Sequence, residues 1–295
     1  MEYPRAHFTN NAGAFVLSGS ELTIGAGGIT NISANGQIIN NSITLATNQT
    51  WYATSNTFTF NGNINNVTHL LTITGSSNSY INGVISGTNG LTKTGAGTLT
   101  LTASDFYGGL TTVSAGVLKI QHGSALGTTT TGTTVSSGAA LQLQGDIAVD
   151  GETLTLNGSG ILGSGALRSL SGSNWWSGAI TLACSSTIGA DAGTLDLEAN
   201  IANATLTTTF TNAGTILLNG GLVGGTGKLV KNGPGLLLLG GSNTYSGTTT
   251  FNDGTVRCGA AGTLSSASAV TVNTNAILDL NDFSQTIASL AGAGG

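Results

Sequence analysis

Charged side chains are scarce in this chain of 295 residues, which has 7 Lys and Arg, 12 Asp and Glu and a net charge of −5. Only 6% of the residues are charged, whereas roughly a quarter are charged in an average globular domain. So few basic residues form no patch for phosphate groups, and we expect no nucleic-acid partner. Low charge also occurs in disordered chains, but those are poor in apolar residues, and 39% of this chain is hydrophobic. The composition therefore predicts a folded protein with a surface of mostly hydroxyl and amide groups.

Cysteine is nearly absent, with Cys184 and Cys258 as its two representatives. Two cysteines support neither a disulfide framework nor a zinc site. Cys184 follows Ile180 and Leu182 at alternate positions, which predicts that it points inward. Cys258 takes the place of the apolar Ile120 in an internal repeat. We interpret both cysteines as buried structural thiols.

Long apolar runs and processing signals are missing too. No segment approaches the roughly 18 apolar residues of a membrane-spanning helix, so we expect no direct membrane insertion. Residues 1–7 lack the apolar region of a signal peptide. Residues 290–295 form no polar cap of the kind that closes a repeat fold. We therefore expect a segment of a longer protein.

Glycine, threonine and internal repetition are what the chain has in abundance. Residues 87–120 recur without a gap as residues 225–258, and residues 173–197 form a degenerate copy. Such self-similarity indicates a solenoid, in which each unit buries its apolar edge against the next. The kept positions are Leu91, Lys93, Gly95, Gly97, Leu99, Leu101, Ser104, Tyr107, Gly109, Thr111 and Gly116, with the counterparts Leu229, Lys231, Gly233, Gly235, Leu237, Leu239, Ser242, Tyr245, Gly247, Thr249 and Gly254.

A shorter period lies within the long one. The motif Ser-(Asn/Asp)-x-aromatic ends at Phe58, Tyr80, Tyr107, Trp176 and Tyr245. The last three of these aromatic residues are evenly spaced along the sequence. A unit of about 23 residues divides both their spacing and the offset between the repeat copies, so we predict coils of about 23 residues, roughly 13 of them. Asn or Asp tolerates a left-handed backbone and bonds its own turn, and the aromatic residue should fill the space where the chain bends back toward the core.

Short segments alternate apolar and polar residues, such as Thr-Leu-Thr-Leu-Thr at 98–102 and Thr-Leu-Asp-Leu-Glu at 194–198. Half-buried strands have this period of two. The 47 glycines and the many threonines disfavour helices, and parallel crossovers are nearly always right-handed. The sequence thus predicts an all-β fold, a right-handed single-stranded parallel β-helix (β-solenoid), as a single domain over residues 1–295.

The spacing Leu-x-Lys-x-Gly-x-Gly-x-Leu-x-Leu, followed by Ser-(Asn/Asp)-x-Tyr-x-Gly-x-Thr, resembles the autotransporter passenger-associated β-strand repeat. The copies at 87–120 and 225–258 cover about a quarter of the chain. The resemblance implies a right-handed β-helix within a large secreted or surface-displayed bacterial protein. It also implies a C-terminal membrane β-barrel in a longer parent, which exports the passenger. It implies no catalytic residues.

The acidic residues are the candidates for catalysis. They fall into two groups, Asp146, Asp150 and Glu152, and Asp191, Asp196 and Glu198. Two acids two apart on a strand are about 6.6 Å apart, which is within the range that glycoside hydrolases use. Such spacing is also common on solvated strands, so we interpret both groups as surface acids. We predict no catalytic, cofactor-binding or metal site.

Two lysines and one tryptophan complete the candidates. Lys93 and Lys231 are equivalent in the repeat, and we interpret them as residues that solubilise a strand edge and deter mispairing. Trp176 aligns with the motif aromatics and should pack inside. Trp175 precedes it at a tolerant position, so we predict an exposed ring and a candidate ligand contact, for instance with a sugar.

Together these observations indicate a non-catalytic stalk or adhesin-like segment of a secreted or surface-displayed autotransporter-type protein. We expect it outside the bacterium, held at the outer membrane through the parent's barrel. Its expected partners are neighbouring β-helix coils, that barrel, and a host-surface or glycan ligand. The alternatives are a polysaccharide-active β-helix enzyme, either a lyase or a glycoside hydrolase, and a glycan-binding module.

Overall fold

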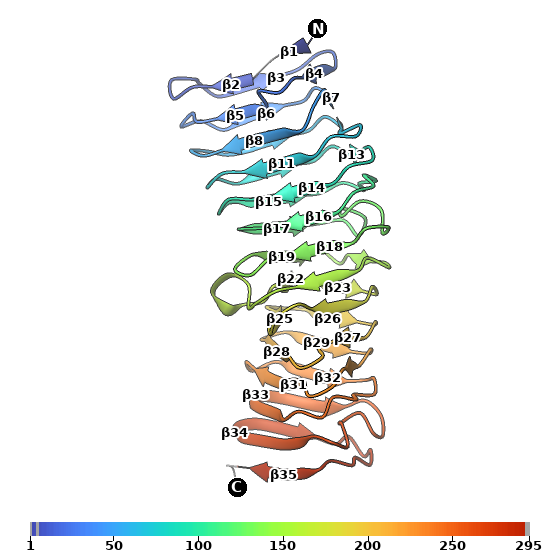
Figure 1. Ribbon diagram of the computed structural model, residues 1–295. Coiled ribbons are helices and arrows are strands. Elements are labelled where there is room, and N and C mark those ends of the chain that lie inside the picture. Colours follow the sequence, from blue (N-terminus) through green and yellow to red (C-terminus); the bar gives the residue numbers. More distant parts are fainter. Residues whose placement is uncertain (1, 4–5, 293–295) are drawn as a thin grey trace. The chain divides into compact units, whose positions relative to one another are not determined.

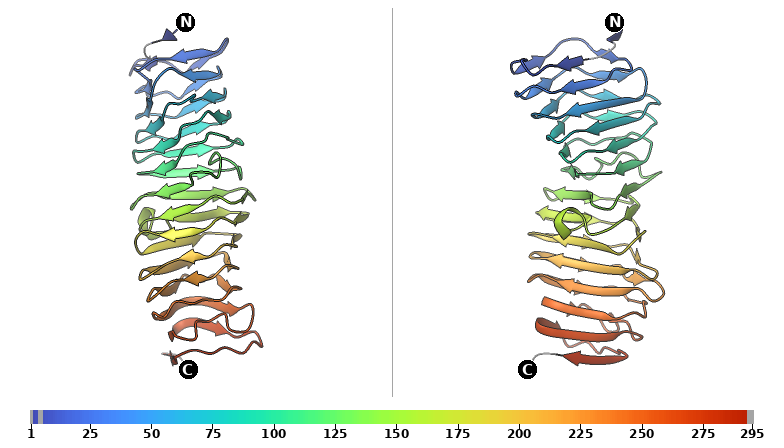
Figure 2. Two further views of the ribbon diagram at one scale, coloured as in Figure 1. Left: turned by 45° about the vertical axis from the view of Figure 1, so that its right-hand side comes forward. Right: turned by 60° about the vertical axis from the view of Figure 1, so that its left-hand side comes forward.

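The computed structural model describes residues 2–3 and 6–292, so Pro4 and residues 293–295 lie outside the described part. The chain divides into two compact units, Met1–Leu141 and Gln142–Gly295. Each unit is a stack of short parallel strands (Figure 1), and the views in Figure 2 show the same stacking from two other sides. Among the described residues, no helix is long and apolar enough to cross a membrane.

Unit 1 contains three parallel ladders. Ladder 1a consists of β1 (Glu2–Tyr3), β4 (Leu22–Ile24), β7 (Ile43–Leu45), β10 (Ile64–Asn65) and β13 (Ile85–Ser86). Ladder 1b consists of β2 (Ala6–Phe8), β5 (Ile29–Asn31), β8 (Gln49–Ala53), β11 (Leu71–Thr74), β14 (Leu91–Lys93), β16 (Thr111–Val113) and β18 (Thr133–Val135). Ladder 1c consists of β3 (Phe15–Leu17), β6 (Gln37–Ile39), β9 (Phe58–Phe60), β12 (Ser79–Ile81), β15 (Thr98–Leu101) and β17 (Val117–Ile120). β19 (Ala140–Gln144) contains the sequence boundary between the units.

Unit 2 repeats this arrangement. Ladder 2a consists of β22 (Leu167–Ser171), β25 (Ser186–Ala190), β28 (Thr207–Asn212), β31 (Lys228–Asn232), the first parts of β33 (Thr249–Cys258) and β34 (Ala269–Asp279), and β35 (Ser289–Gly292). Ladder 2b consists of β20 (Ala148–Val149), β23 (Ser173–Trp176), β26 (Thr194–Leu197), β29 (Thr215–Leu218), β32 (Leu236–Leu239) and the second parts of β33 and β34. Ladder 2c consists of β21 (Leu154–Leu156), β24 (Ile180–Leu182), β27 (Ile201–Ala202) and β30 (Leu222–Val223), and the 3₁₀ turn η1 (Ile161–Gly163) follows β21.

The prediction of an all-β parallel β-solenoid is confirmed. Ladders 1b and 2a each have seven strands within the described residues. Their sum of fourteen strands, one for each coil, is close to the predicted total of roughly 13 coils. The right-handed direction of the coil stays a prediction.

Coil length differs from the prediction and varies along the chain. Leu71 pairs with Gln49 on one side and with Leu91 on the other, so both coils are shorter than the predicted length of about 23 residues. In unit 2, Thr194 pairs with Thr215, which again makes a shorter coil. One coil is longer than predicted, because Leu154 pairs with Ile180. The offset between the two repeat copies is therefore not a sum of six equal coils.

Inward side chains form continuous columns along each ladder. In ladder 2b, Leu195, Ile216, Leu237 and Val256 are stacked in register, and all four are fully buried. In ladder 1b the alternate, outward positions carry a column of five half-exposed threonines: Thr50, Thr72, Thr92, Thr112 and Thr134. This inside–outside alternation is what the period of two predicted.

Glycine is required where one coil's corner lies against the next. Gly116 has φ +66°, and a Cβ on it would lie 2.4 Å from the carbonyl oxygen of Gly95. Its repeat counterpart Gly254 has φ +75°, and a Cβ there would lie 2.5 Å from the oxygen of Gly233. A side chain at either position meets both backbone strain and a backbone clash.

The two cysteines differ from each other. Cys258 is fully buried, as predicted, and burial raises the pKa of its thiol. Cys184 is only partly buried, so its prediction as a buried thiol is wrong. The strand β24 ends at Leu182, and the inward–outward alternation ends with it.

Candidate functional site

The repeated lysines lie inside the fold rather than at a solvated strand edge. Lys93 is 2% exposed and Lys231 is fully buried, so their interpretation as solubilising residues is wrong. Lys93 lies two residues after Leu91 on β14, on the same inward face, and Lys231 has the same place on β31. The period of two predicts that both side chains point inward, whereas their positive charge favours an exposed position.

Backbone carbonyls surround each ammonium group. Lys93 Nζ donates to the carbonyl oxygens of Thr94 (2.7 Å), Gly95 (2.8 Å) and Ala115 (3.2 Å). The third acceptor belongs to the next coil, so the lysine links two successive corners. Three acceptors use all three N–H donors of an ammonium group, which explains how a charged side chain is tolerated there.

The second lysine repeats this geometry. Lys231 Nζ donates to Asn232 O (3.0 Å), Gly233 O (2.6 Å) and Asp253 O (3.2 Å). Burial lowers the pKa of both lysines to about 8, and the nearby Asp253 acts in the opposite direction on Lys231. The kept lysine and the kept glycines of the repeat thus form one structural corner.

The motif aromatics are mostly core residues. Phe58, Tyr107, Trp176 and Tyr245 are at most 1% exposed, whereas Tyr80 points outward on β12 and is half-buried. Each buried tyrosine hydroxyl bonds a threonine hydroxyl, Tyr107 to Thr111 at 2.7 Å and Tyr245 to Thr249 at 2.6 Å. Burial raises the pKa of Tyr245 to about 12. None of the Asn or Asp residues of the described motif copies has a positive φ, so their tolerance of a left-handed backbone is not used.

Trp175 is exposed on ladder 2b, as the sequence predicted. Its side chain is 41% exposed, whereas that of Trp176 is fully buried. Trp175 pairs with Ala148 on one side and Asp196 on the other. Asp196 Oδ1 accepts a hydrogen bond of 2.8 Å from Asn219 Nδ2 on the following coil. The exposed indole therefore shares the outward face of ladder 2b with a carboxylate that is bonded to an amide.

The first group of acids does not converge on one point. Glu152 is 2% exposed, so its interpretation as a surface acid is wrong. Asp146 and Asp150 are exposed. Asp146 Oδ1 accepts the Ser173 N–H at 2.6 Å, and Asp150 Oδ1 accepts the Ser177 hydroxyl at 3.5 Å. These two carboxylates cap backbone and side-chain donors of the next coil.

The second group is split as well. Asp196 and Glu198 share an outward face, as predicted, and burial raises the pKa of Asp196, with the charge of Glu198 adding to the rise and the Asn219 hydrogen bond opposing it. Asp191 lies elsewhere, in an ion pair with Arg168. No group of three or more His, Cys, Asp or Glu in the described part of the chain could hold a metal ion.

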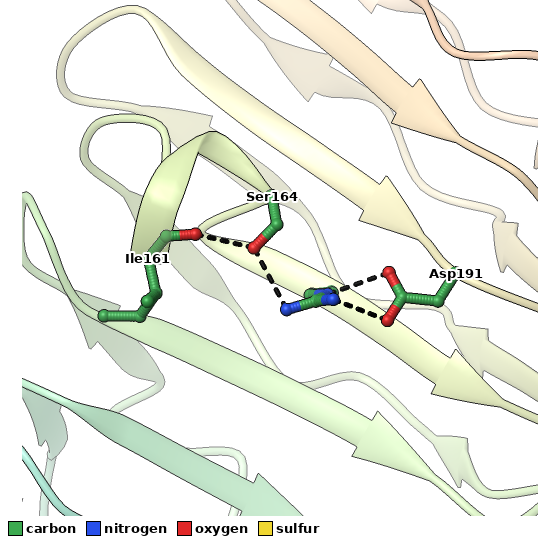
Figure 3. A network of polar contacts seen from close by, with 4 residues as sticks. Ile161, Ser164 and Asp191 are labelled. Atoms are coloured by element: carbon green, nitrogen blue, oxygen red, sulfur yellow. Dashed lines mark hydrogen bonds and ion pairs between the residues drawn. The ribbon is translucent and has the colours of Figure 1, made fainter.

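The longest coil carries a projecting loop, residues 157–166, around η1 (Figure 1). Its tip residue Leu162 is fully exposed and has φ 52°, which is strained for a leucine. Ser164 Oγ donates to Ile161 O at 2.6 Å and accepts from Arg168 Nη1 at 3.0 Å (Figure 3). Sequence reasoning missed this loop, because the even spacing of the motif aromatics hid the insertion.

Arg168 anchors the loop to the next coil. Its guanidinium binds both carboxylate oxygens of Asp191, at 2.8 and 2.6 Å. A shallow cleft of about 310 Å³ lies beside this pair, lined among others by Ser164, Asp191, Asn212 and Pro234. Asp191 is the one carboxylate among the described lining residues, and both its oxygens are already bound. Glycoside hydrolysis needs two acidic groups, which this cleft does not provide.

Comparison with known proteins agrees with the repeat structure described above. The family model of the Passenger-associated-transport-repeat matches residues 91–120 and 229–257. The chain is also similar to the Adhesin BmaC autotransporter of Brucella suis biovar 1 (strain 1330), with 32% identity over 275 aligned residues. That match covers 72% of this chain, which spans 8% of the length of this curated relative. No solved structure matches the chain. The two copies that the sequence resemblance indicated are therefore passenger-associated-transport repeats of autotransporter passengers, carried on a parallel β-solenoid.

Proposed function

We propose that this chain is a non-catalytic structural segment of an autotransporter passenger, displayed on the bacterial surface or released from it. The observation that carries the proposal is the fate of the repeat's kept side chains. The lysines bind backbone carbonyls, the glycines fit under neighbouring carbonyls, and the tyrosines fill the core. These lysines, glycines and tyrosines are all used within the fold, so the repeat supports extension of the coil stack.

The same proposal includes export by a C-terminal barrel of a longer parent protein. It also includes a single continuous solenoid over residues 1–295. Its support is the similarity to an autotransporter adhesin. A fusion of this chain between a generic signal peptide and a generic autotransporter barrel tests surface display. Intact cells should show the chain to antibodies and lose it to added protease. Retention of the chain in the periplasm, with a control passenger exported normally, would contradict the proposal.

The test of the non-catalytic role uses the purified chain. Incubation with a panel of acidic and neutral polysaccharides should release no reducing ends and no unsaturated products. Product release that disappears in Asp191→Asn or Asp196→Asn would instead favour a polysaccharide-active enzyme.

A second candidate function is glycan binding at Trp175. The observation that favours it is the exposed indole beside Asp196 and Asn219, because aromatic faces stack on apolar faces of ligands while polar neighbours fix their orientation. A glycan array with the purified chain tests it. Binding that is lost in Trp175→Ala but kept in Phe106→Ala, another exposed aromatic, would support it, and an array without signal would reject it.

A further inference from the structure

Three copies of the Ser-(Asn/Asp)-x-aromatic motif bury their short polar side chain and bond it to the preceding coil in the same way. Asp105, Asn174 and Asn243 are 3%, 1% and 6% exposed. In each copy the side-chain Oδ1 accepts a backbone N–H from the preceding coil. The donors are Ile85 at 2.7 Å, Ile147 at 3.1 Å and Leu222 at 2.8 Å, respectively. These side chains therefore join one coil to the one before it.

The asparagines also act as donors. Asn243 Nδ2 donates to Thr263 O at 2.5 Å and to Gly241 O at 3.3 Å. Asn174 Nδ2 donates to the Ser169 hydroxyl at 2.8 Å and to Ser171 O at 2.9 Å. An amide can accept and donate at once, whereas an ionised carboxylate can only accept.

Alignment of the two repeat copies predicts equivalent acceptors in the first copy. The repeat aligns Thr263 with Ala125 and Gly241 with Ala103, so backbone carbonyls of equivalent position belong to both copies. A carboxylate facing carbonyl oxygens is repelled, but a carboxylic acid carries the O–H that replaces the amide N–H.

In the part of the chain that the structure describes, Asp105 has no cationic partner. The preceding-coil segment, residues 82–90, has no titratable side chain. Its own segment contributes Tyr107, whose hydroxyl is bonded to Thr111. The following-coil segment, residues 121–128, contributes the exposed His122, whose Nδ1 accepts the Ser124 N–H. Burial raises the pKa of Asp105 to about 8, with the Ile85 N–H acting in the opposite direction.

We propose that Asp105 keeps its proton in the folded coil. As a carboxylic acid it both accepts and donates a hydrogen bond, as Asn174 and Asn243 do with their amides. Ionisation of Asp105 then loosens the coil, which makes this corner of unit 1 a pH-sensitive latch. The sign follows from proton linkage. Between about pH 4 and about pH 8 the folded chain holds a proton that the unfolded chain has lost, so the latch weakens as the pH rises through this window and changes no further above it.

Two exchanged variants of the full chain test the latch. Asp105→Asn replaces the acid by the amide of the other copies, and Asn243→Asp places the acid in unit 2. Hydrogen exchange of the Ile85 amide is measured in the wild-type chain and in Asp105→Asn at each pH. Relative to Asp105→Asn, the wild-type amide should lose protection at least about tenfold between pH 5 and pH 8. The Leu222 amide should gain the same pH dependence only in Asn243→Asp.

Infrared spectroscopy gives an independent readout of the proton. At pH 6.5 the wild-type chain should show the C=O stretch of a buried carboxylic acid, which Asp105→Asn lacks and Asn243→Asp doubles. His122→Gln should keep both the band and the exchange profile. Equal pH profiles of wild type and Asp105→Asn, the absence of an acid band that depends on Asp105, or the loss of the pH dependence in His122→Gln would each overturn the proposal.

Discussion

At the scale of single residues, the buried polar side chains distinguish this chain from a plain apolar stack. Lys93, Lys231 and Asp105 are almost wholly inside, and each bonds to backbone groups that strands at a corner leave unpaired. An unsatisfied buried polar group costs about 1–3 kcal/mol. These residues therefore stabilise the corners more by what they satisfy than by their own charge.

Lys231→Met should lower the free energy of unfolding by about 1–3 kcal/mol, because three carbonyl oxygens lose their donor. Lys228→Met is the matched control, since Lys228 lies on the same strand but is exposed. Urea unfolding of the two variants measures the difference. Equal losses of stability would show that the buried ammonium contributes nothing specific.

The same lysines predict a dependence on alkaline pH. Their pKa is about 8 in the folded chain, against an ordinary value of 10.5, so between these values the unfolded chain binds more protons. Stability should therefore rise as the pH increases from about 8 to about 10.5 and be flat, for these groups, below 8. Urea titrations of wild type and of the Lys93→Met/Lys231→Met double variant measure this. The difference in stability between the two proteins should change with pH only inside this window, and a fall in wild-type stability there, relative to the double variant, would contradict the sign.

At the scale of elements, the tight corners depend on glycine for two separate reasons. Gly116→Ala adds a Cβ 2.4 Å from a carbonyl oxygen at positive φ, whereas Gly138→Ala meets nothing within 4 Å at a similar φ of +79°. Positive φ alone costs a residue with a Cβ about 1–2 kcal/mol. Gly138→Ala should lose about that much, and Gly116→Ala clearly more, in thermal unfolding. A loss in Gly138→Ala as large as in Gly116→Ala would mean that backbone strain, not coil contact, selects glycine.

We expect the ion pair to fix the conformation of the projecting loop while contributing little to the free energy of unfolding. The Arg168–Asp191 pair is partly exposed, with 25% and 40% of the side chains accessible, and such pairs contribute under about 1 kcal/mol. Asp191→Asn should thus leave the urea midpoint nearly unchanged while limited proteolysis within residues 157–166 speeds up. Unchanged proteolysis would show that Ser164 and the backbone fix the loop without the ion pair.

The strands could be predicted from the sequence because alternation records burial directly. Thr98–Leu101 and Thr194–Leu197 are strands with the expected inward leucines. Exposed Trp175 and buried Trp176 followed from repeat alignment. Burial of the lysines was missed because backbone carbonyls, which compensate the charge, leave no mark in the side-chain sequence. The coil length was overestimated because the even spacing of the last motif aromatics was taken for whole coils. The register leads from Trp176 through three coils to Leu239, and Tyr245 lies beyond it.

At the scale of the whole chain, each coil is a unit that contributes contacts only to its neighbours. Leucine columns, lysine corners and the Asp/Asn links all join one coil to the next. Removal of one full coil should then leave the remaining ladders in register. Removal of half a coil puts a strand of ladder 2a in the place of a strand of ladder 2b. Strands and corners of different ladders then meet along the stack, which should destroy it.

Deletion of residues 194–214 tests this coil-by-coil construction most directly, because it joins Gly193 to Thr215, the register partner of Thr194. The measurement is urea unfolding followed by far-UV circular dichroism, with deletion of residues 194–204 as the control. We expect a cooperative transition and an unchanged β signal per residue for the full-coil deletion, and an unfolded or aggregated chain for the half-coil deletion. Loss of folding in both deletions, or folding in both, would contradict the independence of the coils.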